Sequence, residues 1–313
     1  MIFFQIVLYF LSFFILWYCS GIIIRLVDRF AHRLKLSSFA VSFFVLGILT
    51  SVPEFSVGIN SIINKTPDVF VGNLLGASLV LFVFVIPLLA VFGNGVKMVH
   101  QLTEQDMIFA LLVVAAPVFL IADNVLTRTE SVFLILIYVI LFYFIEKKKG
   151  LLEVNKEKKH LKEKHLLEES LEFILAIVIT FLASRFIVNT TVDLAEYFKV
   201  SSFMISVVFL SIGTNIPEIS LAIRSILMGK KEVALGDYLG SAAANTLFFG
   251  IFTLLNGARI NISSYSLRTL IITLFGLGVF YLFSQSKKEI SQKEGKVLLL
   301  IYLLFVISQI LFP

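Results

Sequence analysis

Long apolar runs bounded by charged residues recur along the whole chain. An apolar helix of about 20 residues crosses the ~30 Å hydrocarbon core of a bilayer, and a helix satisfies its own backbone polar groups in lipid. The alternating period typical of barrel strands is absent. The pattern therefore predicts an all-α polytopic membrane protein with ten transmembrane helices, over residues 2–19, 37–62, 69–93, 107–122, 131–145, 170–188, 201–228, 233–256, 266–284 and 295–312.

Composition agrees with a membrane protein and excludes a water-soluble globular domain. Of 313 residues, 58% are hydrophobic and only 15% are charged, whereas an average soluble domain has about 25% charged residues. Cys19 is the single cysteine, which excludes an intramolecular disulfide. The net charge of +5 does not imply nucleic acid, because membrane-protein loops collect Lys and Arg for orientation. We expect a lipid bilayer as the environment and no cofactor.

The distribution of Lys and Arg predicts the orientation of the chain. The N-terminal MIFFQIVLYF lacks the basic region of a signal peptide, so the first span is expected to be retained with its N-terminus outside. The loops after odd-numbered spans then hold nineteen Lys and Arg and the loops after even-numbered spans hold six. By the positive-inside rule the odd loops are cytoplasmic and both termini lie outside. The size suggests a prokaryotic plasma membrane.

A charged segment divides the chain near its middle. Residues 146–169 contain eight Lys and six Glu, and a solvated cytoplasmic linker is favoured over a lipid-contacting basic segment because the charges nearly balance. The domains predicted on this basis are a five-helix unit over 1–145 and a second over 170–313.

The two units resemble each other at an offset of 164 residues. Residues 37–76 and 201–240 share 17 of 40 identities, which include Ser, Thr, Pro, Glu and Gly. Five spans is an odd number, so the second copy must enter the membrane inverted. Inverted repeats are typical of transporters, with the substrate site near the midplane, although a duplicated bundle need not transport anything.

Two glutamates stand in the interior of predicted spans at equivalent repeat positions. A carboxylate at that depth costs at least ~2.5 kcal/mol, so Glu54 and Glu218 need a cation, a proton or a partner. For either residue alone, a protonated interhelical hydrogen bond is the simpler interpretation. Their repetition in register instead favours a cation site, in which the two carboxylates approach each other across the pseudo-two-fold axis.

Each glutamate is accompanied by a hydroxyl and a proline. A threonine lies four residues earlier on the same helix face, and the intervening Pro53 or Pro217 frees the carbonyl four residues before it; alone, each proline would indicate only a kink. Ca²⁺ takes 6–8 oxygen ligands. The predicted oxygen ligands are the side chains of Thr50, Glu54, Thr214 and Glu218 and the backbone carbonyls of Leu49 and Gly213.

The third and eighth predicted spans add a second, unequal pair. Gly72 and Gly76 match Gly236 and Gly240, a spacing that lets helices approach closely. Four-residue steps from Asp237 reach Ser241 and Asn245, whereas the same steps from Asn73 reach Ala77 and Leu81. The polar lining should therefore be lopsided toward the second half. Ser241 and Asn245 are predicted ligands, and Ser51, Asn215, Asn73 and Asp237 are possible secondary ligands.

GILTSVPE at residues 47–54, SIGTNIPE at 211–218 and the glycine steps at Gly72 and Gly236 resemble the cation/Ca²⁺ exchanger superfamily, and in particular its prokaryotic sodium/calcium exchangers. The resemblance implies Ca²⁺ binding, in competition with Na⁺, by the two motif threonines and glutamates. It also implies alternating access, in which the first and sixth helices slide as a gate past the other eight.

The chain departs from the family pattern at several positions. The family usually presents Gly-Ser followed four residues later by Asn or Asp in both copies, but the first copy here has Ala77 and Leu81. In the second copy, Asn245 is an amide where a carboxylate is common, and Asn215 replaces a typical serine. These changes should weaken Na⁺ sites most and put the family's three-sodium stoichiometry in doubt.

The favoured function is a secondary antiporter that extrudes Ca²⁺ in exchange for Na⁺, and no catalytic residues are expected. A close variant uses H⁺, because buried paired glutamates can carry protons. A cation channel and a non-transporting family member are weaker alternatives. An enzyme is the least favoured, because no histidine lies near either glutamate.

Overall fold

The computed structural model describes residues 2–33, 47–97, 104–149, 166–216, 218–219, 223, 231–257, 259–262, 267–286 and 289–311. Within these residues the chain is almost entirely helical, and seven helices are long and apolar enough to cross a membrane. Two shorter apolar helical stretches, Gln5–Cys19 and Ser202–Thr214, accompany them. The protein is therefore a polytopic all-α membrane protein.

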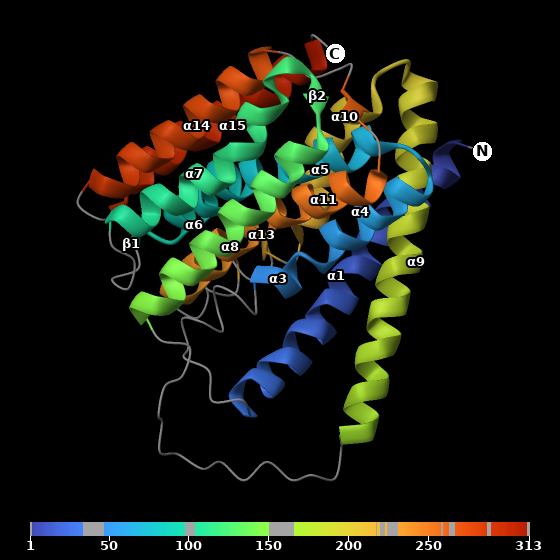
Figure 1. Ribbon diagram of the computed structural model, residues 1–313, viewed down its shortest axis with the longest axis horizontal. Coiled ribbons are helices and arrows are strands. Elements are labelled where there is room, and N and C mark those ends of the chain that lie inside the picture. Colours follow the sequence, from blue (N-terminus) through green and yellow to red (C-terminus); the bar gives the residue numbers. More distant parts are fainter. Residues whose placement is uncertain are drawn as a thin grey trace.

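The helices follow one another in the order shown by the colours of Figure 1, with short strands in some connections. In the first half they are α1 (Ile2–Arg33), α3 (Gly47–Thr50), α4 (Val52–Ile63), α5 (Pro67–Val80), the π-helical η2 (Leu81–Val85), α6 (Ile86–Phe92), β1 (Val96–Lys97), α7 (Glu104–Leu120), the 3₁₀ turn η3 (Ile121–Asp123), β2 (Val125–Leu126) and α8 (Arg128–Lys149). In the second half they are α9 (Leu166–Phe198), α10 (Ser202–Ile205), the π-helical η5 (Ser206–Leu210), α11 (Ser211–Thr214), α13 (Lys231–Asn256), β3 (Ile260–Asn261), α14 (Leu267–Gln285), β4 (Glu289–Ile290) and α15 (Gln292–Leu311).

Two predicted helix lengths were wrong. The first and sixth spans, expected over 2–19 and 170–188, are the 32-residue α1 and the 33-residue α9. A helix of 33 residues is about 50 Å long, well beyond the ~30 Å hydrocarbon core. Hydropathy marks where a helix leaves the apolar layer, whereas the backbone continues because residues 20–33 and 189–198 contain no proline. At the predicted linker, α8 continues to Lys149 and α9 begins at Leu166; residues 150–165 lie outside the described residues.

The two long helices pack together at one side of the molecule (Figure 1). Their contact includes a buried hydrogen bond of 2.9 Å between the Tyr9 and Thr191 hydroxyls. Phe13, Leu16 and Ile187 belong to a small apolar cluster there, separate from the main core. The α1–α9 contact thus shares one apolar cluster with residues of α4, α5, α10 and η5.

The main apolar core surrounds α5, α6 and α13. The buried share of an 18-residue apolar stretch differs between the spanning helices. This share is 83% in Pro67–Phe92 and 78% in Tyr238–Asn256, but only 33% in the spans within α9, α14 and α15. The central helices therefore face protein on nearly all sides. The outer helices leave large apolar side chains, such as Leu136 and Leu303, on a surface suited to lipid.

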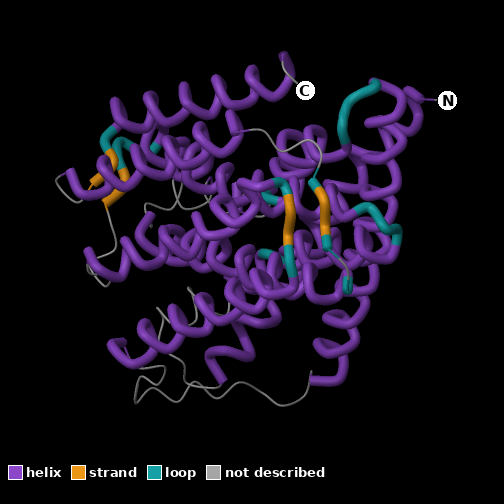
Figure 2. Tube along the Cα trace, turned by 45° about the horizontal axis from the view of Figure 1, so that its top comes forward, coloured by secondary structure: helices purple, strands orange, loops and turns teal. Residues whose placement is uncertain are grey.

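Two short antiparallel sheets join the halves of the chain (Figure 2). β1 pairs with β4, and β2 pairs with β3. The connections also share a capping box, in which Thr127 and Ser291 each exchange hydrogen bonds with a glutamate three residues later, Glu130 and Glu294. Each of these strands and boxes in the first half has its counterpart 164 residues later in the second.

Candidate cation-binding site

The second predicted span is broken at the motif proline. α3 ends at Thr50, and α4 begins at Val52 with Pro53 in its first turn and Ser51 between them. A proline in the first helical turn loses little, because its missing N–H would have no helical partner there. The break places the Glu54 carboxyl in the protein interior, with only 1% of the residue exposed. Neither of its oxygens has a hydrogen-bond partner among the described residues.

The second glutamate lies in a chain of hydroxyl contacts that crosses between the halves. The Ser241 hydroxyl donates to Glu218 Oε1 at 3.2 Å, and the Ser241 and Ser51 hydroxyl oxygens are 2.8 Å apart. Ser51 also donates to the Gly47 carbonyl at 2.8 Å. Ser51 and Ser241 have two hydroxyl hydrogens for these three contacts, so at most two of the contacts are ordinary two-centre hydrogen bonds.

A second polar contact across the halves lies beside Glu54. The Thr214 hydroxyl neighbours the Glu54 carboxyl and donates to Asn73 Oδ1 at 3.2 Å. Both Thr214 and Asn73 are fully buried. The motif threonine of the second half therefore lies beside the glutamate of the first, whereas the sequence paired each threonine with the glutamate of its own half.

Glycines allow the broken helices to reach the centre. A Cβ built on Gly47 would lie 2.6 Å from the Gly240 carbonyl carbon, and one on Gly76 would lie 2.3 Å from the Val207 carbonyl oxygen. α3 therefore crosses α13, and the η5–α11 helix crosses α5, with backbones nearly in contact. Only glycine fits at these positions, and the site residues lie at the two crossings.

The structure separates some predicted ligands from the glutamates. Asn245 donates to Ser78 at 3.4 Å, and Asn215 donates to the Ser211 carbonyl at 2.7 Å, so neither amide is hydrogen-bonded to a glutamate. The side-chain oxygens of both amides lack a partner among the described residues. Ala77 and Leu81 are fully buried apolar residues, as the lopsided pattern predicts.

The remaining predicted groups are two backbone carbonyls, the Thr50 hydroxyl and the Asp237 carboxylate. Leu49 stands in α3, one residue before Thr50, and its carbonyl lies in the last turn before the break. The Gly213 carbonyl receives the Asn215 N–H. Thr50 is buried, and its hydroxyl lies 3.4 Å from the Gly47 carbonyl. Asp237 stands on α13, but its side chain lies outside the described residues, as does Pro217.

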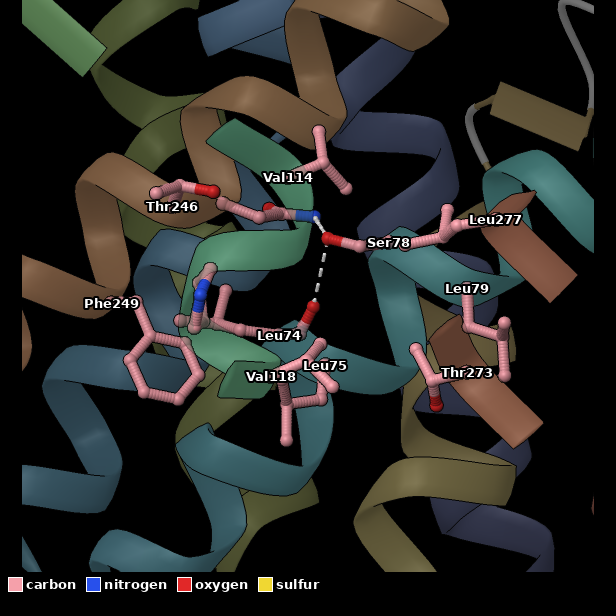
Figure 3. Close-up of a pocket in the computed structure, with 12 residues that line it drawn as sticks. Leu74, Leu75, Ser78, Leu79, Val114, Val118, Thr246, Phe249, Thr273 and Leu277 are labelled. Atoms are coloured by element: carbon pink, nitrogen blue, oxygen red, sulfur yellow. Dashed lines mark hydrogen bonds between the residues drawn. The ribbon is translucent and has the colours of Figure 1, made fainter. Parts of the chain in front are cut away.

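Asn245 lines a small cavity between α5, α7, α13 and α14 (Figure 3). The centre of a water molecule could occupy about 10 Å³ of this cavity, which is close to the volume that one bound water requires. Ser78 and Thr273 also line this cavity, and the nearby Thr246 hydroxyl donates to the Val113 carbonyl at 3.0 Å. Pro117, four residues after Val113, leaves that carbonyl without its helical donor. Asn245 therefore belongs to a side cavity in this structure.

Sequence reasoning missed two residues that support the site. The buried Tyr238 hydroxyl donates to the Glu218 backbone carbonyl at 3.3 Å, and the Phe13 ring fills the space beside Gly213. Tyr238 could have been noticed as a phenol in an apolar span whose repeat counterpart is Leu74. Nothing in the sequence distinguishes Phe13 from the other phenylalanines of the first predicted span, so its contact with Gly213 could not be predicted.

Buried carboxylates between broken helices define a membrane protein that handles cations inside the bilayer. A profile of the sodium/calcium exchanger protein family matches residues 4–146 and 170–311. The chain belongs to this family, and with it to the cation/Ca²⁺ exchanger superfamily.

Individual relatives are distant but span most of the chain. The putative antiporter CaxA of Alkalimonas amylolytica is 24% identical over 289 residues, which cover 87% of this chain and 88% of CaxA. The structure resembles a crystal structure of the H⁺/Ca²⁺ exchanger CAX with a TM-score of 0.77 and 16% identity, covering 99% of this chain and 82% of CAX. It also resembles the sodium-calcium exchanger NCX_Mj soaked with Na⁺ and Sr²⁺, with a TM-score of 0.68 and 20% identity over 98% and 99% of the two chains.

Proposed function

We propose that this protein is a secondary antiporter that exchanges Ca²⁺ for Na⁺ across a prokaryotic plasma membrane, and that it is not an enzyme. The cation is held between Glu54 and Glu218, with Thr50 and Thr214 and the carbonyls of Leu49 and Gly213 as further oxygen ligands. Family membership supports the class of transport. The particular site and the choice of Na⁺ are our proposals.

The observation that carries this proposal is the buried Glu54 carboxyl. Both of its oxygens are enclosed without a hydrogen-bond partner among the described residues, and an uncompensated carboxylate at membrane depth is costly. A bound cation would compensate this charge. It would also lie near the Ser51–Ser241–Glu218 contacts, which bring hydroxyl oxygens to the second glutamate.

We further propose ten spanning helices in two inverted five-helix repeats, 1–145 and 170–313, joined by a cytoplasmic linker over 146–169, with both termini outside. The matched strands and capping boxes at an offset of 164 residues support the repeat. The distribution of Lys and Arg supports the orientation.

Alternating access follows from the cost of the empty site. When both carboxylates are charged and unloaded, a passage through a closed, low-dielectric state is unfavourable. Loading with Ca²⁺ or Na⁺ removes that cost, so the gate formed by α1 and α9 moves only with cargo. Competition of the two ions for the same carboxylates then couples their opposite fluxes.

The test is ⁴⁵Ca²⁺ uptake into proteoliposomes under an imposed Na⁺ gradient, compared with an imposed pH gradient. Na⁺-driven uptake is expected, and uptake driven by neither gradient would overturn the antiporter assignment.

The glutamate pair is tested by Glu54→Gln and Glu218→Gln in the same assay. Each variant should abolish exchange, because the amide keeps the shape of the side chain but removes the charge that the cation needs. Ser284→Ala, a buried hydroxyl far along α14, is the matched control and should exchange normally. Full Ca²⁺ affinity and flux in either glutamine variant would exclude the paired-carboxylate site.

A second candidate is H⁺-coupled Ca²⁺ exchange. The structural likeness to the H⁺/Ca²⁺ exchanger CAX and the burial of both glutamates, which can carry protons, favour it. The pH-gradient arm of the uptake assay decides between the two candidates.

A further inference from the structure

A broad apolar groove opens on the side of the molecule that carries α1. Its volume is about 730 Å³, and its walls are α1, the end of α9 and the α10–η5–α11 helix, with one contribution from the end of α15. Phe10, Phe14 and Phe209 line it and leave half or more of their surface exposed. The one hydroxyl on the α1 wall, that of Tyr9, is already hydrogen-bonded to Thr191. The groove therefore suits an apolar occupant.

The length of the groove matches one leaflet of a bilayer. On α1 its lining runs from Ile6 to Trp17, a rise of about 16 Å along the helix axis, or about half of the ~30 Å hydrocarbon core. On the opposite wall it runs from Val200, in the connection between α9 and α10, to Ile216 beyond the end of α11. The groove thus reaches from a membrane face to the depth of the motif threonine.

The shallow end of the groove carries the features of a lipid headgroup zone. Lys199 is exposed and stands between Phe198 and Val200, both of which line the groove. Tyr197 and Phe198 are exposed aromatic residues at the same helix end, where aromatic belts of membrane proteins lie. The acidic Glu196 is exposed one turn earlier but does not line the groove. The positively charged Lys199 side chain at the end of this apolar groove complements a lipid with an anionic headgroup.

We propose that this groove binds one anionic phospholipid, with an acyl chain between α1 and the η5–α11 helix and its phosphate at Lys199. The chain would lie against Phe13, whose ring fills the space beside Gly213. Gly213 directly precedes Thr214, so the lipid braces α1 against the helix that carries the second motif. This site adjoins the proposed cation site at Gly213, which lines the groove, but it does not depend on the exchange proposed above.

The only tryptophan in the chain lines this groove, so the native protein reports on it directly. Trp17 is half-buried against Phe14, with ring centroids 5.2 Å apart. The protein is reconstituted in phosphatidylcholine vesicles with a small fraction of phosphatidylglycerol brominated near the middle of its acyl chains, or with the same fraction of brominated phosphatidylcholine. Bromine quenches the tryptophan on contact. We expect brominated phosphatidylglycerol to occupy the groove about fivefold more readily, the preference that one lysine near the surface provides.

Matched variants separate the groove from ordinary lipid contact. Lys199→Gln should bring the ratio of quenching by the two lipids close to one, whereas Glu196→Gln should leave the preference in place. In Trp17→Phe/Leu303→Trp, the tryptophan moves to an exposed position on α15 and should be quenched equally by both lipids.

Equal quenching of native Trp17 by the two lipids, or a preference unchanged in Lys199→Gln, overturns the proposal. Absence of quenching overturns it too, because protein would then cover the groove. Ca²⁺ flux is not measured, so failure here is distinct from failure of the antiporter assignment.

Discussion

At the scale of single residues, the two glutamates differ in their surroundings although the sequence presents them as a pair. Glu218 receives the Ser241 hydroxyl, while Glu54 has only neighbours that bond elsewhere. The difference follows from the repeat, because the counterpart of Ser241 is Ala77. The cation is therefore expected to depend most on Glu54 for charge and on the Glu218 side for additional oxygens.

Ser241→Ala should lower the apparent affinity for Ca²⁺ by roughly fivefold, since one hydrogen bond in a buried site contributes about 1 kcal/mol. The Ca²⁺ concentration dependence of ⁴⁵Ca²⁺ uptake measures this effect. Ser78→Ala is the control, because Ser78 bonds to Asn245 and Leu74 rather than to a glutamate. An unchanged affinity in Ser241→Ala would show that this hydroxyl serves packing only.

Ala77→Ser combined with Leu81→Asn restores oxygen ligands on α5 and at the start of η2. The double variant should raise the affinity for Na⁺ or the Hill coefficient of Na⁺-dependent Ca²⁺ flux, since Na⁺ sites need more oxygens than the first half now offers. Ala242→Ser, a similar buried change on α13 at a non-equivalent position, is the control. Identical Na⁺ dependence in the double variant and the native protein would contradict our account of the missing ligands.

At the scale of elements, the breaks and crossings explain how short helices form a buried site. α3 is only four residues long and gains little stability from its own hydrogen bonds, so its packing against α13 must hold it. That packing depends on Gly47, whose hydrogen faces the Gly240 backbone. The site geometry is thus set by a helix crossing rather than by local helix propensity.

Gly47→Ala should destabilise the protein by about 1–3 kcal/mol, the usual range for overpacking a tight contact. The thermal unfolding midpoint in detergent measures the change. Gly278→Ala on α14 is the control, because nothing lies within 4 Å of its added Cβ, and it should unfold at or slightly above the native temperature. A Gly47→Ala midpoint equal to that of Gly278→Ala would mean that α3 can move away from α13.

The sequence predicted the elements better than their ends, and the contact of Ser241 better than that of Asn245. Apolar runs located the long spans, but hydropathy could not find the ends of α1 and α9, because a helix continues through polar residues that lack a breaker. The repeat predicted that Ser241 and Glu218 share a site, and they are hydrogen-bonded. It could not predict that Asn245 bonds to Ser78, because that choice depends on the cavity formed beside Pro117 on a helix far away in sequence.

At the scale of the whole molecule, the short sheets connect one set of helices and do not include α1 and α9. The two-stranded sheets tie the connections flanking α6, α7, α8, α13, α14 and α15. α1 and α9 have no strand among the described residues; α1 packs mainly on α9, whereas α9 packs on both α1 and α4. This division suits a gate of two helices that slides along a clamped core.

Cross-links can test that division in a Cys19→Ser background. A bismaleimide linking Cys residues at Tyr9 and Thr191 joins α1 to α9 and should leave exchange largely intact. The same reagent linking Cys residues at Phe13 and Gly213 joins α1 to the core and should stop exchange. The second pair relieves its own closest clash, because the three atoms nearest to a Cβ at Gly213 belong to the ring that Phe13→Cys removes. Flux in each variant before cross-linking is the reference, and equal inhibition by both links would rule out a moving pair.

The crossed pairing of strands also bears on how the protein can be made. β1 has its partner in β4 and β2 has its partner in β3, so either half synthesised alone would leave both of its strands and its glycine crossings without a partner. If the two halves were expressed as separate polypeptides, together they would still carry all of these paired strands and crossing glycines. Neither polypeptide would be expected to persist in the membrane without the other.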